Sequence, residues 1–359
     1  MTEFYLGSSL IGANQPTYFV ADIAANHDGD IKRALKLIEL TADSGANAAK
    51  FQNFKAATIV SDYGFKSLGE INSHQSNWGK SVYETYDQAS ISMEWTHSLK
   101  QKCDECGIDY FTAPYDLEII DQLDKYVCAW KVGSGDISWI ELIERLSKGS
   151  TKPLLIATGA SSMSDVRSAM LTASSYTKEI VLMQCNTNYT GSIENLKYVN
   201  LNVIKAYQDE FSDAILGLSD HTPGHATVLG AVSLGARVIE KHFTDDTSRV
   251  GPDHKFSMDP KSWQEMVLRT RELESALGDG NKKVEQNEKE TYVLQRRALR
   301  ATENISVGTL LSKENITPLR PCPPEGLPPS KYSDLIGRVL IRDIQKGDLI
   351  KIEDSVDLA

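Results

Sequence analysis

The 359-residue chain is predicted to form a closed (β/α)8 barrel followed by a smaller C-terminal domain. The first observation behind this prediction is an alternation of short apolar runs with helical patterns, which continues from residue 17 to about residue 280. The second is a length that exceeds one average domain. The third is a change of composition after Gly280. An open, doubly wound sheet is the alternative fold for the same alternation.

Apolar runs of strand length supply the predicted barrel. They are Tyr18–Ile23, Ala48–Gln52, Asp109–Ala113, Ala129–Val132, Leu154–Thr158, Ile180–Gln184, Ala214–Leu218 and Arg237–Lys241. Helical patterns follow most of these runs, at Ile31–Ser44, Met93–Cys106, Leu117–Leu123, Trp139–Ser147, Met163–Ser174, Leu196–Glu210, His225–Leu234 and Lys261–Leu277. In the clearest of them, Ile31–Ser44, apolar residues recur at helical spacing and Gly45 follows the end.

Residues 53–92 do not fit the alternation and carry little clean periodicity. A loop of this length in a compact domain usually has a function. Because it lies between the second and third strands, we expect it to cover a site at the catalytic face of the barrel.

The predicted domain boundaries are 1–282 for the barrel, 283–295 for a charged linker and 296–359 for the second domain. Short strands are expected at Gln295–Ala301, Val339–Asp343 and Leu349–Ile352, and prolines fix the loop paths between them. With about 65 residues and little apolar content, this domain is expected to pack on something larger.

Composition excludes several classes of function. The net charge is −11 and the basic residues form no long runs, which argues against nucleic acid as the main partner. The start, MTEFYLGSSLIG, lacks the pattern of a signal peptide, and no window approaches ~18 consecutive apolar residues, so we expect a cytoplasmic protein without a membrane partner. Five scattered cysteines fit a reducing compartment, and the Cys103–Cys106 pair lacks the further ligands of a zinc site.

Two histidines stand at the ends of the last two predicted strands. His221 follows Ala214–Leu218 and His242 follows Arg237–Lys241. Because the carboxyl ends of parallel strands meet at one rim, both imidazoles could share a metal ion and leave other coordination positions open for water and substrate. A plainer alternative is that one histidine caps a helix and the other is packed in the core.

Nearly every strand delivers a polar group to the same rim. The groups are Asp22, Lys50, Gln52, Thr112, Lys131, Ser134, Thr158, Asn186, Thr187, Tyr189, Ser219, His221, Lys241 and His242. Three lysines together with hydroxyl groups match a pocket for phosphate and carboxylate. The glycines of Lys131–Gly135 add a turn whose backbone amides can face an anion.

The sequence resembles the sialic acid synthase family over essentially its whole length. The motifs that carry the resemblance are Ala21-Asp22-Ile23, Asn26-His27-Asp28-Gly29, Ala49-Lys50-Phe51-Gln52, Lys131-Val132-Gly133-Ser134-Gly135-Asp136, Gly217-Leu218-Ser219-Asp220-His221, Glu240-Lys241-His242-Phe243-Thr244, Gly251-Pro252-Asp253 and Arg296-Arg297. The resemblance implies a (β/α)8 barrel with an antifreeze-like SAF domain. It also implies a homodimer in which each SAF domain caps the partner's barrel.

The implied reaction condenses phosphoenolpyruvate with an N-acylated mannose-type aldose to give a nonulosonic acid and phosphate. By motif match, His221 and His242 would hold a divalent metal, typically manganese, with magnesium and cobalt as alternatives. Phosphoenolpyruvate would be bound by Lys50, Thr112, Lys131, Ser134, Thr158, Thr187 and Ser219. The sugar would be contacted by Gln52, Asn77, Tyr189, Asp253 and, from the partner's SAF domain, Arg320.

Asp136 or Asp22 is expected to orient the attacking water or accept its proton. Asp22 stands where the family is expected to have glutamate, and within the 53–92 loop Asn72 is an alternative to Asn77. Two other functions remain open at this point. One is a related synthase that takes a phosphorylated aldose, and the other is a non-catalytic carbohydrate- or ice-binding protein.

Overall fold

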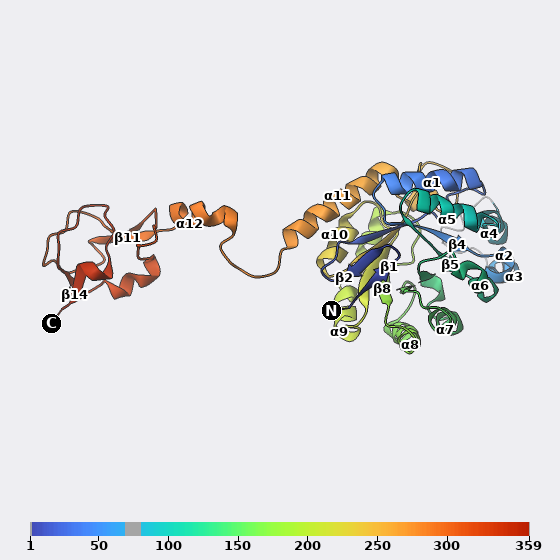
Figure 1. Ribbon diagram of the computed structural model, residues 1–359, viewed down its shortest axis with the longest axis horizontal. Helices are drawn as coiled ribbons and strands as arrows, with labels where there is room; N and C mark the ends of the chain where they lie inside the picture. The colour runs from blue at the N-terminus through green and yellow to red at the C-terminus, as the bar shows by residue number, and fades with distance from the viewer. Residues whose placement is uncertain (1, 69–79, 359) are drawn as a thin grey trace. The chain divides into compact units, whose positions relative to one another are not determined.

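The computed structural model describes residues 2–68 and 80–358, and the chain divides into two compact units, Met1–Gly278 and Asp279–Ala359 (Figure 1). Within the described residues of the first unit, eight parallel strands close into a barrel in the order β10-β3-β4-β5-β6-β7-β8-β9. These strands are β3 (Tyr18–Asp22), β4 (Ala48–Asn53), β5 (Asp109–Pro114), β6 (Trp130–Val132), β7 (Leu154–Ala157), β8 (Ile180–Cys185), β9 (Ile215–Asp220) and β10 (Val238–His242). The predicted barrel is confirmed, and the open sheet is wrong because β10 pairs with β3.

Helices surround the barrel where helical periodicity predicted them (Figure 1). They are α1 (Ile31–Asp43), α5 (Trp95–Glu105), α6 (Ile120–Asp124), α7 (Ile140–Lys148), α8 (Met163–Ser174), α9 (Val203–Glu210), α10 (Ala226–Ser233) and α11 (Pro260–Leu277). One prediction was too long. The pattern Leu196–Glu210 is split into a 3₁₀ turn at Ile193–Tyr198 and helix α9, because Asn200 between them adopts a left-handed backbone with φ of 50°.

In the described part of the interval between β4 and β5 there are three short helices that the sequence pattern did not reveal. They are α2 (Ala56–Ile59), α3 (Asp62–Ser67) and α4 (Val82–Ala89). Neither α3 nor α4 buries a residue, so neither shows the apolar stripe by which a helix is recognised. Helix α4 begins instead with a reciprocal capping box between Ser81 and Glu84.

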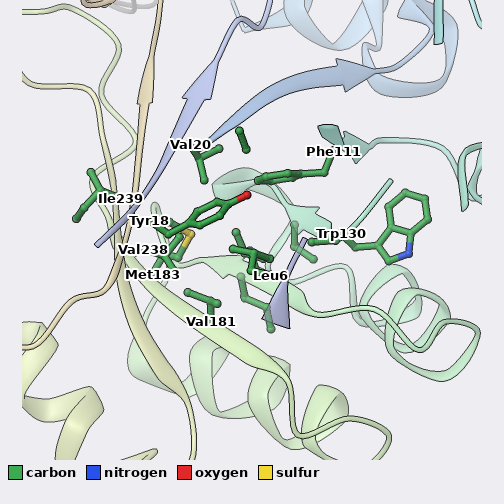
Figure 2. Packing of buried hydrophobic residues seen from close by; sticks show 14 of the residues in the cluster. Leu6, Tyr18, Val20, Phe111, Trp130, Val181, Met183, Val238 and Ile239 are labelled. Carbon is green, nitrogen blue, oxygen red and sulfur yellow. The ribbon is translucent and has the colours of Figure 1, made fainter. Parts of the chain in front are cut away.

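An N-terminal hairpin, also missed by the sequence pattern, joins the barrel near the beginning of its strands. Its strands β1 (Glu3–Leu6) and β2 (Ser9–Gly12) turn at Gly7, whose φ of 59° suits glycine. The backbone N–H of Ser8 donates to Asp109 at the start of β5. Leu6 is fully buried, and Figure 2 shows it close to Val181 and Met183.

The second unit has a small core of its own. It contains helix α12 (Lys289–Gln295), the antiparallel pair β11 (Ala298–Ala301) and β12 (Ile316–Leu319), and the antiparallel pair β13 (Arg338–Leu340) and β14 (Ser355–Asp357). The predicted strand Leu349–Ile352 is wrong. Leu349 makes only an isolated bridge with Arg300, and a 3₁₀ turn begins at Ile352, so β14 takes the place beside β13.

Replacing Leu6 by alanine should lower the free energy of unfolding of the first unit by about 2–5 kcal/mol, because it leaves a cavity under the barrel. Urea unfolding followed by tryptophan fluorescence measures the loss. Leu171→Ala is the matched control, since Leu171 is 73% exposed and its truncation should change stability by less than about 0.5 kcal/mol. Equal losses in the two variants would contradict this role of the hairpin.

Candidate active site

A cavity of about 310 Å³ opens among residues at the carboxyl ends of the strands and in the β4–β5 interval. It is lined by Ala25, Gln52, Phe54, Ile59, Thr85, Tyr86, Ala89, Tyr115, Ser134, Gly135, Asp136, Thr187, Tyr189, His242, Pro252 and Asp253. Several residues predicted for the site therefore do come together. The volume suits a small ligand.

A buried cluster of two lysines and two carboxylates lies next to this cavity. The Nζ atom of Lys50 lies 2.6 Å from Asp22 Oδ2 and 3.6 Å from Glu240 Oε1. The same Glu240 oxygen lies 3.4 Å from Nζ of Lys131. Burial would lower the pKa of the Lys50 ammonium, but Asp22 and Glu240 raise it above its usual value, so Lys50 stays charged.

Glu240 was given no role in the sequence analysis, although it lies at the centre of this cluster. It also receives a hydrogen bond of 3.4 Å from the Ser219 hydroxyl. Its second oxygen, Oε2, is buried and has no hydrogen-bond partner among the described residues. The sequence could have identified Glu240 by its spacing. It is two residues from His242 on the same strand, so both side chains point to the same side.

The prediction that Lys241 joins the rim is wrong. Because side chains alternate along a strand, Lys241 points to the opposite side of β10 from its neighbours Glu240 and His242. Its Nζ atom pairs with Asp220 and donates to the backbone carbonyl of Thr222 at 2.6 Å. The buried cluster beside the cavity therefore contains two of the three predicted lysines, Lys50 and Lys131.

The same alternation keeps two predicted phosphate ligands out of the cluster. The Thr112 hydroxyl donates to the Phe51 carbonyl at 2.9 Å and to Asn53 at 2.8 Å. The Thr158 hydroxyl receives a hydrogen bond of 2.9 Å from Tyr207 of α9. Both hydroxyl groups are therefore engaged in contacts away from the lysine cluster.

Two predicted hydroxyl ligands do lie side by side in the cavity wall. Thr187 donates to the Ser134 hydroxyl at 2.9 Å. Gly159 makes this approach feasible, because a Cβ atom there would overlap the Thr187 hydroxyl and lie 2.9 Å from Ser134 Cβ. Ser219 faces the same cluster through Glu240.

The two histidines are near neighbours, with ring centroids 5.3 Å apart. Nδ1 of His221 lies 3.0 Å from the Asn186 carbonyl, an acceptor only, so Nδ1 carries the proton and Nε2 keeps a lone pair. Nδ1 of His242 is buried without a partner among the described residues. Burial lowers the pKa of both rings, which keeps them neutral, as metal ligands must be.

The histidine pair therefore fits a divalent metal. Nε2 of His221 and a ring nitrogen of His242 are the atoms that would hold such an ion, which would supply Lewis-acid chemistry at this rim. Within the described part of the chain, no group of three or more His, Cys, Asp and Glu side chains is arranged to hold a metal.

The carboxyl groups of the site differ in their surroundings. Asp22 pairs with Lys50 and accepts a hydrogen bond of 3.0 Å from Gln52, so it is already engaged. Burial raises the pKa of Asp136 to about 6, although Lys131 opposes the shift. Burial likewise raises the pKa of Asp253 to about 7, and its Oδ2 accepts a hydrogen bond from the Ala25 N–H at 3.0 Å.

The remaining predicted sugar contacts have different outcomes. Tyr189 lines the cavity with its ring centroid 4.4 Å from that of His221. Asn77 and Asn72 lie outside the described residues. Arg320 follows β12 in the second unit, so its contact with a partner's sugar stays a prediction.

Comparison with known proteins identifies the family. The NeuB family model matches residues 37–282, and the SAF domain model matches residues 296–354. The chain belongs to the NeuB family. It is 33% identical over 342 residues to the N,N'-diacetyllegionaminic acid synthase of Legionella pneumophila, with 94% of each chain covered. It is 29% identical to the human N-acetylneuraminate-9-phosphate synthase, covering 97% of this chain and 94% of the relative.

A solved structure supports the same conclusion. The N-acetylneuraminic acid synthetase of Leptospira borgpetersenii, in complex with citrate, matches with a TM-score of 0.70 and 28% identity, covering 81% of this chain and 95% of that one. The NeuB-family chain is therefore an enzyme rather than a non-catalytic binding protein. No helix in its described part combines the length and hydropathy that crossing a bilayer requires.

The raised pKa of Asp253 in this NeuB-family enzyme predicts a specific pH dependence of stability. The folded state keeps a proton that the unfolded chain releases near pH 4, so this contribution is complete below about pH 4 and is lost as pH rises through about 7. Asp253→Asn should therefore lose less stability than the wild type between pH 5 and pH 8. Melting temperatures measured across that range test this, and parallel curves for the two proteins would contradict it.

Proposed function

We propose that this enzyme condenses phosphoenolpyruvate with an uncharged, N-acylated mannose-type aldose and water, giving a nonulosonic acid and phosphate. The observation that supports this reaction most is that the Lys50–Glu240–Lys131 cluster and the neutral histidine pair lie at the same rim of the barrel. Lysines suit an anionic substrate, and a metal-binding histidine pair suits a carbonyl substrate.

Phosphoenolpyruvate would lie against the two lysines. Lys50 and Lys131 would neutralise its phosphate and carboxylate, and the hydroxyl groups of Ser134, Thr187 and Ser219 would donate directed hydrogen bonds. Because these contacts exist in both the ground state and the transition state, they should contribute to binding more than to the rate of the chemical step.

His221 and His242 would hold the metal, for which we propose manganese, with magnesium and cobalt as alternatives. When bound, the ion supplies a Lewis acid for the aldehyde oxygen. Carbon 3 of phosphoenolpyruvate forms the new bond to carbon 1 of the open-chain sugar, and the aldehyde oxygen takes up a proton. Water adds to carbon 2, and phosphate leaves with its bridging oxygen to give the ketone.

Asp136 is the proposed acceptor of the proton that this water loses. It lines the cavity, and a pKa of about 6 leaves it mostly ionised at neutral pH and close to the ideal for a general base. Asp22 is less suited to this role, because its carboxylate is already paired with Lys50 and bonded to Gln52.

The far wall of the cavity favours an uncharged acceptor. Phe54 lies there with ring centroids 5.4 Å from Tyr86 and 6.1 Å from Tyr115, giving an apolar surface for acyl or methyl groups. Lys50 and Lys131 are assigned to phosphoenolpyruvate, and among the described residues that line the cavity none is a further lysine or arginine for a second phosphate group, which weighs against a phosphorylated aldose. Gln52, Tyr189 and Asp253 are the proposed partners of the sugar hydroxyl groups.

The assembly stays a prediction from the resemblance, and the location stays a prediction from the sequence pattern and the cysteine content. A homodimer would place Arg320 of one SAF domain at the partner's sugar, and the enzyme would work in the cytoplasm.

Phosphate release from phosphoenolpyruvate tests the reaction directly. The acceptors should be N-acetylmannosamine, the diacetamido-trideoxy hexoses and arabinose 5-phosphate, each with manganese and with or without EDTA. We expect release with at least one N-acylated sugar, its loss with EDTA, and none with arabinose 5-phosphate. Release with arabinose 5-phosphate alone would favour the phosphorylated acceptor, and release with no sugar would refute the proposed reaction.

The histidine pair can be tested separately. His242→Ala should abolish manganese binding in titration calorimetry and reduce turnover by at least about a hundredfold, while the melting temperature without metal changes little. His225→Ala is the matched control, because His225 only precedes α10 and does not line the cavity. Manganese binding by folded His242→Ala at wild-type affinity would remove this metal assignment.

A further inference from the structure

Two loops form one wall of the cavity, and a set of polar contacts ties them together. The first loop follows β3 and contributes Ala25, and the second follows β10 and contributes Pro252 and Asp253. Asp253 is the only one of these three with an ionisable side chain. How the second loop is held therefore decides where a carboxyl group faces the substrate.

Asp28 and His254 make the central contact between the loops. Nε2 of the fully buried His254 lies 2.9 Å from Asp28 Oδ1. His254, Arg249 and Arg33 hold the pKa of the Asp28 carboxyl below its usual range although burial opposes this, so Asp28 is an acceptor and His254 Nε2 donates. Nδ1 of the same ring lies 2.7 Å from the Thr244 hydroxyl, so the imidazole is fixed at both nitrogens.

Neighbouring contacts extend this connection to Asp253 itself. The amide of Asn26 donates to the Phe243 carbonyl at 2.9 Å and to the Ser257 hydroxyl at 2.8 Å. That hydroxyl donates in turn to the backbone carbonyl of Asp253 at 2.7 Å. The Asp253 carboxyl receives the N–H of Ala25. Both the main chain and the side chain of Asp253 are thus held by the first loop or by groups bonded to it.

Close packing around His254 shows how little room this arrangement leaves. A Cβ atom on Gly251 would lie 2.6 Å from His254 Cδ2, so the chain can pass the imidazole only as glycine. Asp28 itself has a left-handed backbone, with φ of 52°. Such a conformation costs free energy in a residue other than glycine and persists where the surrounding contacts enforce it.

We propose that His254 and Asp28 are positioning residues that set the Asp253 carboxyl against the acceptor sugar. This inference rests on the proposed function, because it assigns Asp253 to the sugar rather than to phosphoenolpyruvate. Neither positioning residue lines the cavity, so they act through Asp253. The side chains proposed to bind phosphoenolpyruvate have no hydrogen bond with either of them among the described residues, and Lys50 and Lys131 lie on β4 and β6 rather than on the two strands that these loops follow.

This separation predicts an effect on one substrate only. Loss of the Asp28–His254 contact should raise the KM for the sugar by about tenfold or more, since a misplaced carboxyl no longer meets its hydroxyl partner. The KM for phosphoenolpyruvate should stay within about twofold of the wild type. A defect of the whole barrel would change both constants together.

Two substitutions of one residue distinguish the contact from mere packing. The amide of Asn in His254→Asn can replace Nδ1 and keep the Thr244 contact, but it cannot reach Asp28. The longer side chain of His254→Gln can replace Nε2 and keep the Asp28 contact. We expect His254→Asn to show the selective loss and His254→Gln to retain most of the sugar affinity. Arg249→Ala is the control, because Arg249 contacts Asp28 from the exposed side and leaves His254 in place.

Both KM values are measured for the wild type and the three variants, together with amide hydrogen exchange of residues 243–258. Selective loss in His254→Asn, with faster exchange in this segment, supports the proposal. Equal changes in both KM values, or no change in either, overturn it. If the wild type itself releases no phosphate with any sugar, the proposed function fails, and exchange decides whether the contact holds the loop. Unchanged exchange in His254→Asn then overturns the positioning role.

Discussion

The alternation of side chains along the barrel strands is the constraint on which the site depends. Consecutive residues of a strand point to opposite sides, so the last residues of each strand divide between the barrel interior and the surrounding helices. In β10, Glu240 and His242 point inward while Lys241 points outward to Asp220. In β4, Lys50 and Gln52 share the inward side with Asp22 of β3. The charged groups of the cluster lie at the carboxyl ends of the strands, above a mostly apolar floor in which the Tyr18 hydroxyl donates to Asp109.

Charge balance is what allows so many polar groups to be buried together. Burying an isolated ammonium or carboxylate group costs so much free energy of hydration that its pKa shifts and the group becomes neutral. Lys50 stays charged because Asp22 and Glu240 lie beside it, and the same Glu240 oxygen lies 3.4 Å from Nζ of Lys131. Lys241 and Asp220 form a second buried pair of opposite charges on the outward side of β9 and β10.

Much of the fold could be predicted from the sequence because the eight barrel strands are buried and mostly apolar, and helical patterns separate most of them. The hairpin of β1 and β2 could not, since strands of four residues carry too few positions to show a period. Nor could helices α3 and α4, which bury nothing. For the site, position at a strand end identified His221, His242, Lys50 and Lys131. Position at a strand end could not show that Lys131 belongs to the cluster and Lys241 does not. It also could not distinguish Ser134 from Thr112 and Thr158. Both distinctions require knowing which alternate side chains of each strand face the barrel interior.

The pairing of the two lysines with two carboxylates affects how the enzyme would release its phosphate product. With two positive and two negative side chains, the cluster carries no net charge before substrate arrives. Inorganic phosphate that remains after the reaction therefore meets lysines already satisfied by Asp22 and Glu240, and it competes with them for the same ammonium protons. In the proposed reaction, this competition would weaken the binding of the phosphate product and of phosphoenolpyruvate alike, because each anion must displace a carboxylate already in place.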